Sequence, residues 1–298
     1  MATLLFASDG RLHPLWRYLL AAGYAFTVNL FALFVVSAFH PATLPAFESA
    51  YRPMVAVLLL AGFTLLARTA DRAARPLGYM GFTHRSPLEA SREFLLGLGI
   101  GGAMVGLCVA AIVAGGSYQV TLNFGAWAWK LALVELWILL CGALGEELAF
   151  RGYPFQRLLE AFPPGVAIVV SSALFAAVHL GNPGIGRVAY ANTLLIGALF
   201  SLAYLRRRNL WLVWGMHFGW NVFLGMVFGL PVSGFSEFSV IVTGAAQGPW
   251  WLTGGSYGIE GGVVATVVIV AAAPCLWLLP RRETYLQPEP PSAPESGI

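Results

Sequence analysis

The sequence predicts an all-α, polytopic membrane protein with about eight transmembrane helices around a polar intramembrane cavity. Of its 298 residues, 58% are hydrophobic and only 10% are charged, and the mean hydropathy is +0.73. Soluble domains carry about 25% charged residues. Because the apolar segments run from end to end, we expect one membrane domain over residues 12–282, with a motif core at 126–230. Residues 283–298 are rich in Pro, which predicts a disordered tail.

A membrane span needs about 20 mostly apolar residues. Eight segments approach or exceed this length, and the second and fifth are the shortest of them. The eight segments are 15–39, 54–67, 94–114, 126–144, 165–180, 188–205, 210–230 and 261–279.

The basic residues are distributed unevenly between the loops that join these spans. If the first span starts inside, 14 of the 17 Lys and Arg residues fall on one side, and only Arg52, Lys130 and Arg187 fall on the other. The positive-inside rule then places both termini in the cytoplasm, and we expect a bacterial cell membrane. The net charge of +3 is too small to indicate nucleic acid as a partner.

Polar residues within the spans are the candidates for function, because an ionisable group in hydrocarbon costs about 2.5–3.5 kcal/mol. The fourth span ends with Glu146, Glu147 and Arg151. On a helix, Glu147 and Arg151 share a face, whereas Glu146 lies about 100° from Glu147. Arg151 can therefore neutralise Glu147 and leave Glu146 available as a general base. The alternative is a helix end at the interface with three solvated charges.

Two other spans carry the remaining groups of interest. His179 follows Phe175 by one turn in the fifth span, and His217 precedes Asn221 by one turn in the seventh. An imidazole and a carboxamide in fixed geometry suit an oxyanion hole, where one donor is worth about 3–4 kcal/mol. The alternative is helix packing, but hydrogen bonds between membrane helices average only about 0.6 kcal/mol. Together with Glu146, these groups point to a hydrolase that activates water.

Three motifs, Glu146-Glu147-x-x-x-Arg151, Phe175-x-x-x-His179 and His217-x-x-x-Asn221, resemble in order those of the CPBP intramembrane proteases. That family comprises the CAAX prenyl proteases of the Ras-converting type and bacterial relatives linked to bacteriocin processing or immunity. Every motif position carries the expected residue, and the family's eight-span architecture would cover nearly the whole chain.

The resemblance implies an intramembrane endopeptidase in which Glu146 activates water and His179 shares or orients that water. It implies that His217 and Asn221 stabilise the tetrahedral oxyanion. The residues that would support them from behind are Glu147, Arg151 and Phe175.

The participation of a metal stays open at this stage. Glu146, His179 and His217 could form a three-ligand zinc site with an open water position. The HExxH spacing of common zinc proteases is absent. A metal-free site, in which the carboxylate and imidazole activate water directly, is equally allowed and is slightly favoured, although the family is often labelled metalloprotease.

The expected partners are the lipid bilayer and a membrane-anchored peptide or protein substrate, with prenylated CAAX termini as one type. Two alternatives belong to other classes of protein. A proton-coupled transporter would use the buried Glu and His as a relay. A non-catalytic bacteriocin-immunity or scaffold protein would keep its activity without Glu146 or His217.

Three structural questions follow from the sequence. Residues 231–260 contain no Lys or Arg, and they form either a lid over the cavity or, as we favour, a loop whose aromatic residues rest at the interface. Glu135 either extends the cavity or, as we favour, pairs with Lys130. His179 lies about 22 Å along its helix, so contact with Glu146 requires a tilted or broken helix, or a span four that dips below the membrane surface; the break at 152–154 permits a re-entrant connection.

Overall fold

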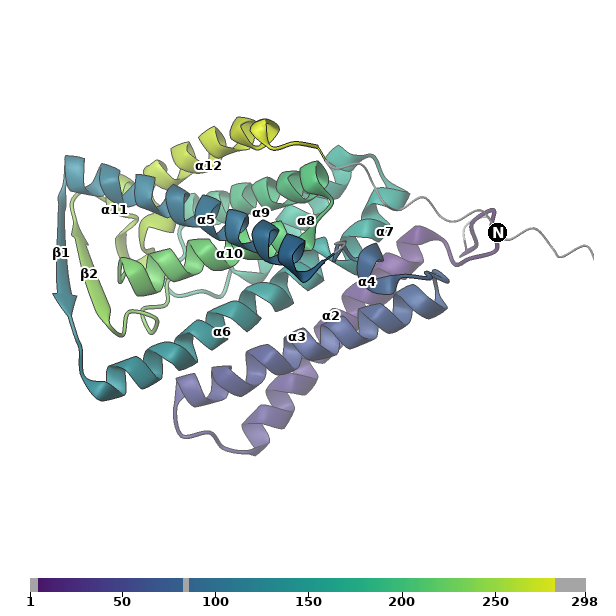
Figure 1. Ribbon diagram of the computed structural model, residues 1–298, viewed down its shortest axis with the longest axis horizontal. Coiled ribbons are helices and arrows are strands. Elements are labelled where there is room, and N and C mark those ends of the chain that lie inside the picture. The colour runs from purple at the N-terminus through teal and green to yellow at the C-terminus, as the bar shows by residue number, and fades with distance from the viewer. Residues whose placement is uncertain (1–4, 83–85, 282–298) are drawn as a thin grey trace, which may run out of the picture.

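The computed structural model describes residues 5–82 and 86–281, and its long helices lie side by side along the long axis of the molecule (Figure 1). The predicted all-α membrane fold is confirmed. The tail expected at 283–298 lies outside the described residues. The helices are α2 Pro14–Ala38, α3 Leu44–Thr69, α4 Pro76–Tyr79, α5 Pro87–Gly115, α6 Ala126–Arg151, α7 Tyr153–Ala161, α8 Pro164–Val178, α9 Arg187–Arg207, α10 Leu210–Val222, η1 Phe223–Val227, α11 Trp250–Thr253, η2 Gly255–Tyr257, η3 Ile259–Gly261, α12 Val263–Cys275 and η4 Leu276–Leu278, and the strands are β1 Ser117–Leu122 and β2 Val242–Gln247.

Among the residues that the structure describes, six helices are long and apolar enough to cross a membrane. The fifth and eighth expected spans correspond to α8 and α12, which are apolar but have only 15 and 13 residues, so the count of eight is not confirmed. The second span is longer than expected. It is the 26-residue α3, which begins ten residues before the expected start. Thr43 caps its first turn, and Pro53 lies inside the helix rather than at its start.

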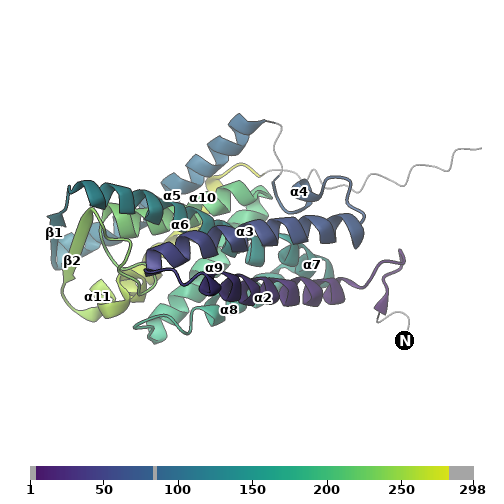
Figure 2. The same ribbon diagram turned by 90° about the horizontal axis from the view of Figure 1, so that it is seen from below.

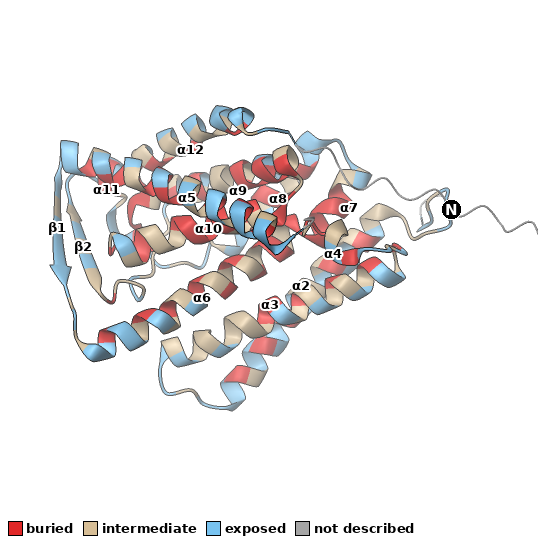
Figure 3. Ribbon diagram, viewed as in Figure 1, coloured by how far each residue is buried: buried red, intermediate tan, exposed pale blue. Residues whose placement is uncertain are grey.

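Large apolar side chains cover the outer faces of the helices. Phe34 is 75% exposed, Leu133 is 69% exposed and Val267 is 62% exposed. Buried and exposed positions alternate around the same helices (Figure 3). An apolar surface of this extent suits lipid rather than water, because soluble proteins seldom expose large contiguous apolar patches.

Glycines bring α5 and α10 into backbone contact. Gly97 and Gly101 on α5 face Gly215 and Gly219 on α10, and a Cβ atom on any of the four would lie 2.1–2.4 Å from a carbonyl oxygen of the other helix. Small residues at one-turn spacing allow membrane helices to approach this closely. The contact fixes the position of α10, the helix that carries two of the predicted site residues.

The connection between α6 and α8 explains how Glu146 and His179 come to the same depth. After Glu146, α6 continues for five residues, and α7 follows a one-residue break at Gly152. At 1.5 Å per residue these two pieces have a combined length of about 21 Å, close to the length of about 22 Å for α8. The helix is thus broken at Gly152, which is one of the arrangements that allow Glu146 and His179 to meet.

A buried ionic network closes the end of the bundle where the N-terminal segment lies (Figure 1). Arg17 of α2 and Arg157 of α7 both donate to Asp71, and they also bind Glu160 at 2.9 and 3.0 Å. Tyr79 donates its hydroxyl to Glu160 at 3.0 Å, and burial raises the pKa of Tyr79, so the phenol stays neutral and able to donate. Because these charges are paired, the network joins α2, α4 and α7 without leaving an isolated buried ion.

The opposite end is formed by the segment 231–260 and the connection between α5 and α6. β1 and β2 pair antiparallel, from Ser117 opposite Gln247 to Leu122 opposite Val242. Trp250 is 60% exposed, as expected for an aromatic residue at the interface. Part of this segment, however, lines the cavity between the helices, so it is more than an interfacial loop; the lining residues are Val232, Ser233, Phe235, Glu237 and Phe238. Figure 2 shows β1, β2 and α11 together at this end.

Candidate active site

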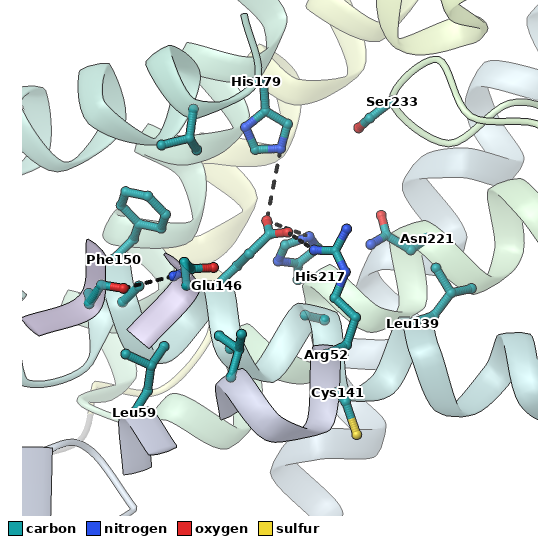
Figure 4. Close-up of a pocket in the computed structure, with 18 of the residues that line it drawn as sticks. Arg52, Leu59, Leu139, Cys141, Glu146, Phe150, His179, His217, Asn221 and Ser233 are labelled. Carbon is teal, nitrogen blue, oxygen red and sulfur yellow. Dashed lines mark hydrogen bonds and ion pairs between the residues drawn. The ribbon is translucent and has the colours of Figure 1, made fainter. Parts of the chain in front are cut away.

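A cavity of about 700 Å³ lies between α2, α3, α6, α8 and α10, with residues of the segment 231–260 along one side. All four residues predicted to be catalytic line it, namely Glu146, His179, His217 and Asn221. Figure 4 shows their side chains around one open space. The expected meeting of the fourth, fifth and seventh spans is therefore present in the fold.

Glu146 lies at the centre of this group. Its Oε2 atom is 3.9 Å from His179 Nε2 and 3.8 Å from His217 Nε2. The same oxygen is buried and has no hydrogen-bond partner among the described residues. Distances of 3.8–3.9 Å are too long for direct hydrogen bonds, but they suit groups that a water molecule bridges.

Glu147 and Arg151, the pair that the helical spacing predicted, hold His217 on the side of its ring away from Glu146. Its Nδ1 atom lies 2.8 Å from Glu147 Oε1, and Arg151 Nη1 lies 3.1 Å from the same oxygen. The Glu147 and Arg151 side chains are completely buried, and Arg151 also donates to the Gly197 carbonyl at 2.7 Å. A carboxylate paired with a guanidinium accepts only, so Nδ1 carries the hydrogen and Nε2 faces Glu146.

His179 is oriented by Phe175. Its Nδ1 atom lies 2.7 Å from the Phe175 carbonyl oxygen, which can only accept, so Nδ1 is again the donor. The Nε2 atom of the ring is therefore the one that faces Glu146. The Phe175 ring also contacts both His179 and Arg151: its centroid lies 4.6 Å from the centroid of the His179 ring and 4.6 Å from the Arg151 guanidinium carbon. Glu147 and Phe175 thus contact the histidines, and Arg151 contacts both Glu147 and Phe175.

Asn221 lies one turn beyond His217 on α10, and its carboxamide faces the same open space as Ser233 (Figure 4). Ser233 comes from the segment 231–260 and has a positive φ of 49°, which is uncommon for a residue other than glycine. Glu260 binds both Ser233 and Trp220, the residue before Asn221. It accepts a hydrogen bond from the backbone N–H of Ser233 and another from Trp220 Nε1 at 2.8 Å.

The three candidate metal ligands match zinc in donor type but not in spacing. Glu146, His179 and His217 supply the right donor types, and both histidines have their Nδ1 atoms bound elsewhere, as ligating histidines usually do. Two ligands of one tetrahedral zinc lie about 3.3 Å apart at bond lengths of 2.0–2.1 Å, closer than the 3.8 and 3.9 Å found here. Within the described residues, no group of three or more His, Cys, Asp or Glu residues has the geometry to hold a metal. The residues as placed do not form a metal site.

Two charged residues of the cavity were missed or misassigned from the sequence. Arg52, counted there with an outer loop, belongs to α3, and its Nη1 atom lies 3.6 Å from Glu146 Oε1. Glu135 was expected to pair with Lys130 at the surface, and this expectation is wrong. Glu135 is 1% exposed and lines the cavity, whereas Lys130 is exposed and makes no ion pair with a described residue.

The fold and this cavity define a multi-pass membrane protein in which carboxylate, imidazole and carboxamide groups meet between apolar helices. Residues 127–223 match the family described as Type II CAAX prenyl endopeptidase Rce1-like, so this part of the chain is an Rce1-like domain. The family consists of proteases, which confirms the enzyme class and the family that the motifs indicated. The match covers about a third of the chain and contains all three motifs. No curated protein and no solved structure shows a significant match to the chain.

Proposed function

We propose that the protein is an intramembrane endopeptidase that hydrolyses peptide bonds with a water activated by Glu146 and His179. The observation that supports this most is the convergence of Glu146 Oε2 with the Nε2 atoms of His179 and His217 inside one cavity. A water bridging these atoms could transfer a proton to Glu146 as its oxygen attacks the carbonyl carbon of the substrate.

The attack breaks the carbonyl π bond and leaves a negative charge on the former carbonyl oxygen. His217 and Asn221 are the proposed donors to this oxyanion. Donation from His217 Nε2 requires a hydrogen on both ring nitrogens, and the Glu147 carboxylate beside Nδ1 stabilises that positive form. The proton held by Glu146 then passes to the amine nitrogen as the C–N bond breaks, which restores the carboxylate.

The proposed substrates are membrane-anchored peptides, with prenylated CAAX-type termini as the first class to test, because the matched family is described as prenyl endopeptidase. Access from the bilayer is supported by the lining of the cavity. Phe26 of α2 and Val178 of α8 both line it and are 67% and 64% exposed on the lipid-facing surface. A lipidated or transmembrane peptide could therefore reach the cavity without leaving the membrane.

We propose that both termini face the cytoplasm, in a bacterial cell membrane. The support is the excess of basic residues at one end, where Arg17, Arg157 and Arg207 are also built into ion pairs. A cysteine-accessibility experiment with a single Cys introduced in the N-terminal segment or in the segment 231–260 tests this. Labelling of the N-terminal position from outside intact cells would overturn it.

The experiment that tests the function is a cleavage assay of purified protein in lipid nanodiscs against a library of membrane-tethered peptides, read by mass spectrometry. Glu146→Gln keeps the shape of the side chain but removes the proton acceptor, and we expect cleavage to fall at least 1000-fold, within the range of losses seen for essential catalytic groups. Glu89→Gln is the matched control, because Glu89 lies at the third position of the α5 cap, where Gln serves equally well.

The cleavage assay, a flux measurement in liposomes and an activity test in cells together separate the proposal from its alternatives. Equal cleavage by Glu146→Gln and wild type would overturn the proposed role of Glu146. Proton-coupled flux in liposomes that Glu146→Gln abolishes, with no peptide ever cut, would identify a transporter. Full biological activity in both Glu146→Ala and His217→Ala cells would identify a non-catalytic immunity or scaffold protein. A chelator arm and metal analysis of the purified protein test metal dependence directly.

A further inference from the structure

A second acidic group lies in the same cavity, and the proposed hydrolysis does not use it. Glu135 of α6 is 1% exposed, lines the cavity, and has one carboxylate oxygen, Oε1, buried without a hydrogen-bond partner among the described residues. An unpartnered carboxylate in an apolar helix is costly, since a buried charge normally requires a counter-ion. Because Glu135 lies on the cavity wall, a cationic group of a ligand in the cavity could reach it.

The charges of the cavity are strongly unbalanced. Its described lining contains four carboxylates, Glu48, Glu135, Glu146 and Glu237, but a single guanidinium, that of Arg52. Arg52 is already engaged, because its Nε atom lies 2.5 Å from Glu48 Oε2 and its Nη1 atom lies 3.6 Å from Glu146 Oε1. No basic side chain of the lining is therefore left for Glu135, whose charged neighbours are Glu48 and Glu237.

Glu135 is also well placed relative to the proposed water-activating group. Glu135 precedes Glu146 by 11 residues, which brings both onto nearly the same face of α6 at a separation of about 16 Å along the axis. An extended peptide covers this distance in about five residues at 3.3 Å each. One substrate strand could thus contact both carboxylates.

We propose that Glu135, with Glu48 and Glu237 nearby, forms a subsite for a positively charged side chain of the substrate, a Lys or Arg about five residues from the bond that is cut. That the bound peptide is a substrate rests on the proposed function, whereas the binding of a cationic side chain does not. A carboxylate that receives a charged hydrogen bond in a site of this kind should favour the basic residue by about tenfold or more.

The test uses a lipid-anchored peptide in which a single Lys is moved one position at a time, with a matched Gln peptide for every position. Binding of each peptide is measured to the Glu146→Gln protein in nanodiscs, so that the readout does not need cleavage. We expect one or two Lys positions to bind about tenfold tighter than their Gln partners. Adding Glu135→Gln should bring this ratio close to one, whereas adding Glu89→Gln should leave it unchanged.

A smaller decrease of the ratio is expected for Glu237→Gln, because Glu237 is exposed and its charge is screened. This variant also covers the case in which Glu135→Gln does not fold. Equal binding of all Lys and Gln pairs, or a preference that survives both substitutions, would overturn the subsite.

Cleavage by the wild-type protein then separates the two proposals. If peptides are cut, the preferred Lys should lie about five residues from the mapped bond. Cutting without any charge preference in binding refutes the subsite and leaves the protease intact. Charge-selective binding without any cutting leaves the subsite standing and refutes the proposed function.

Discussion

The contact between α5 and α10 makes a sharp prediction about stability. Gly101→Ala adds a methyl group whose carbon would lie 2.2 Å from the Met216 carbonyl oxygen, whereas ordinary contacts begin near 3.4 Å. The two helices must therefore separate by about 1 Å or more, because backbone cannot turn aside as a flexible side chain can. Overpacking of this kind costs about 1–3 kcal/mol.

Gly99→Ala is the matched control in the same helix. A Cβ atom on Gly99 meets nothing within 4 Å, so only the helix propensity changes, which should stabilise the protein by about 0.5–1 kcal/mol. Relative to wild type, Gly101→Ala should lower and Gly99→Ala should raise the free energy of unfolding, so the two variants should differ by about 1.5–4 kcal/mol. Thermal or denaturant unfolding in one detergent, with both variants in parallel, measures this difference.

The same substitution should affect the site, because α10 carries His217 and Asn221. A displacement of about 1 Å is enough to misplace donors that must lie within hydrogen-bond distance of the oxyanion, and it can lower the rate about 100-fold. Gly101→Ala should therefore lose peptidase activity even at temperatures where it stays folded. If Gly101→Ala is as stable and active as Gly99→Ala, the backbone contact between α5 and α10 is wrong.

Three further predictions follow from the site. Arg151→Met leaves Glu147 buried without its counter-ion and should cost about 3–5 kcal/mol in unfolding experiments, while adding Glu147→Gln should recover part of the loss; no recovery would refute the pairing. Asn221→Ala should lower kcat about 100-fold with little change in KM, and an effect on KM alone would contradict an oxyanion role. Glu260→Ala leaves the Ser233 N–H unsatisfied, so hydrogen exchange around Ser233 should accelerate, and unchanged protection would show that Glu260 does not hold this loop.

The features that the sequence predicted depend on local periodicity. The apolar spans reflect composition over about 20 residues, and the pairing of Glu147 with Arg151 follows from the four-residue spacing on one helix. The meeting of Glu146, His179 and His217 was inferred from their chemistry, since few other ionisable groups lie inside the spans. The structure brings these three together, but their catalytic roles stay predictions.

The position of Arg52 was missed for a physical reason. The second span was placed from residue 54 onward by its apolar run, which begins only after Arg52 and Pro53. In the structure Pro53 lies inside α3. A signal was present in the sequence, because Glu48 and Arg52 are four residues apart and form the i,i+4 ion pair of a helix that starts earlier.

The environment of Glu135 could not be read from one chain in the same way. Lys130 lies only five residues away and is the nearest basic residue in the sequence, yet on a helix five residues correspond to about 140° of rotation. Glu135 therefore faces the cavity while Lys130 faces outward. Which groups line the opposite wall depends on the packing of α3 and of the segment 231–260, and neither follows from local spacing.

The continuation of α6 into α7 has a consequence for how the site works. Glu146 is followed by the rest of α6 and by α7, and its Oε2 atom is buried, so the carboxylate lies inside the protein rather than at its surface. Hydrolysis at that depth needs water, and water needs polar partners, which the apolar outer faces of the helices cannot provide. The acidic and amide groups of the cavity lining supply such partners. A cavity polar enough to admit water is also one that can accept a cationic side chain, so hydrolysis and the proposed charge selectivity would draw on the same polar lining.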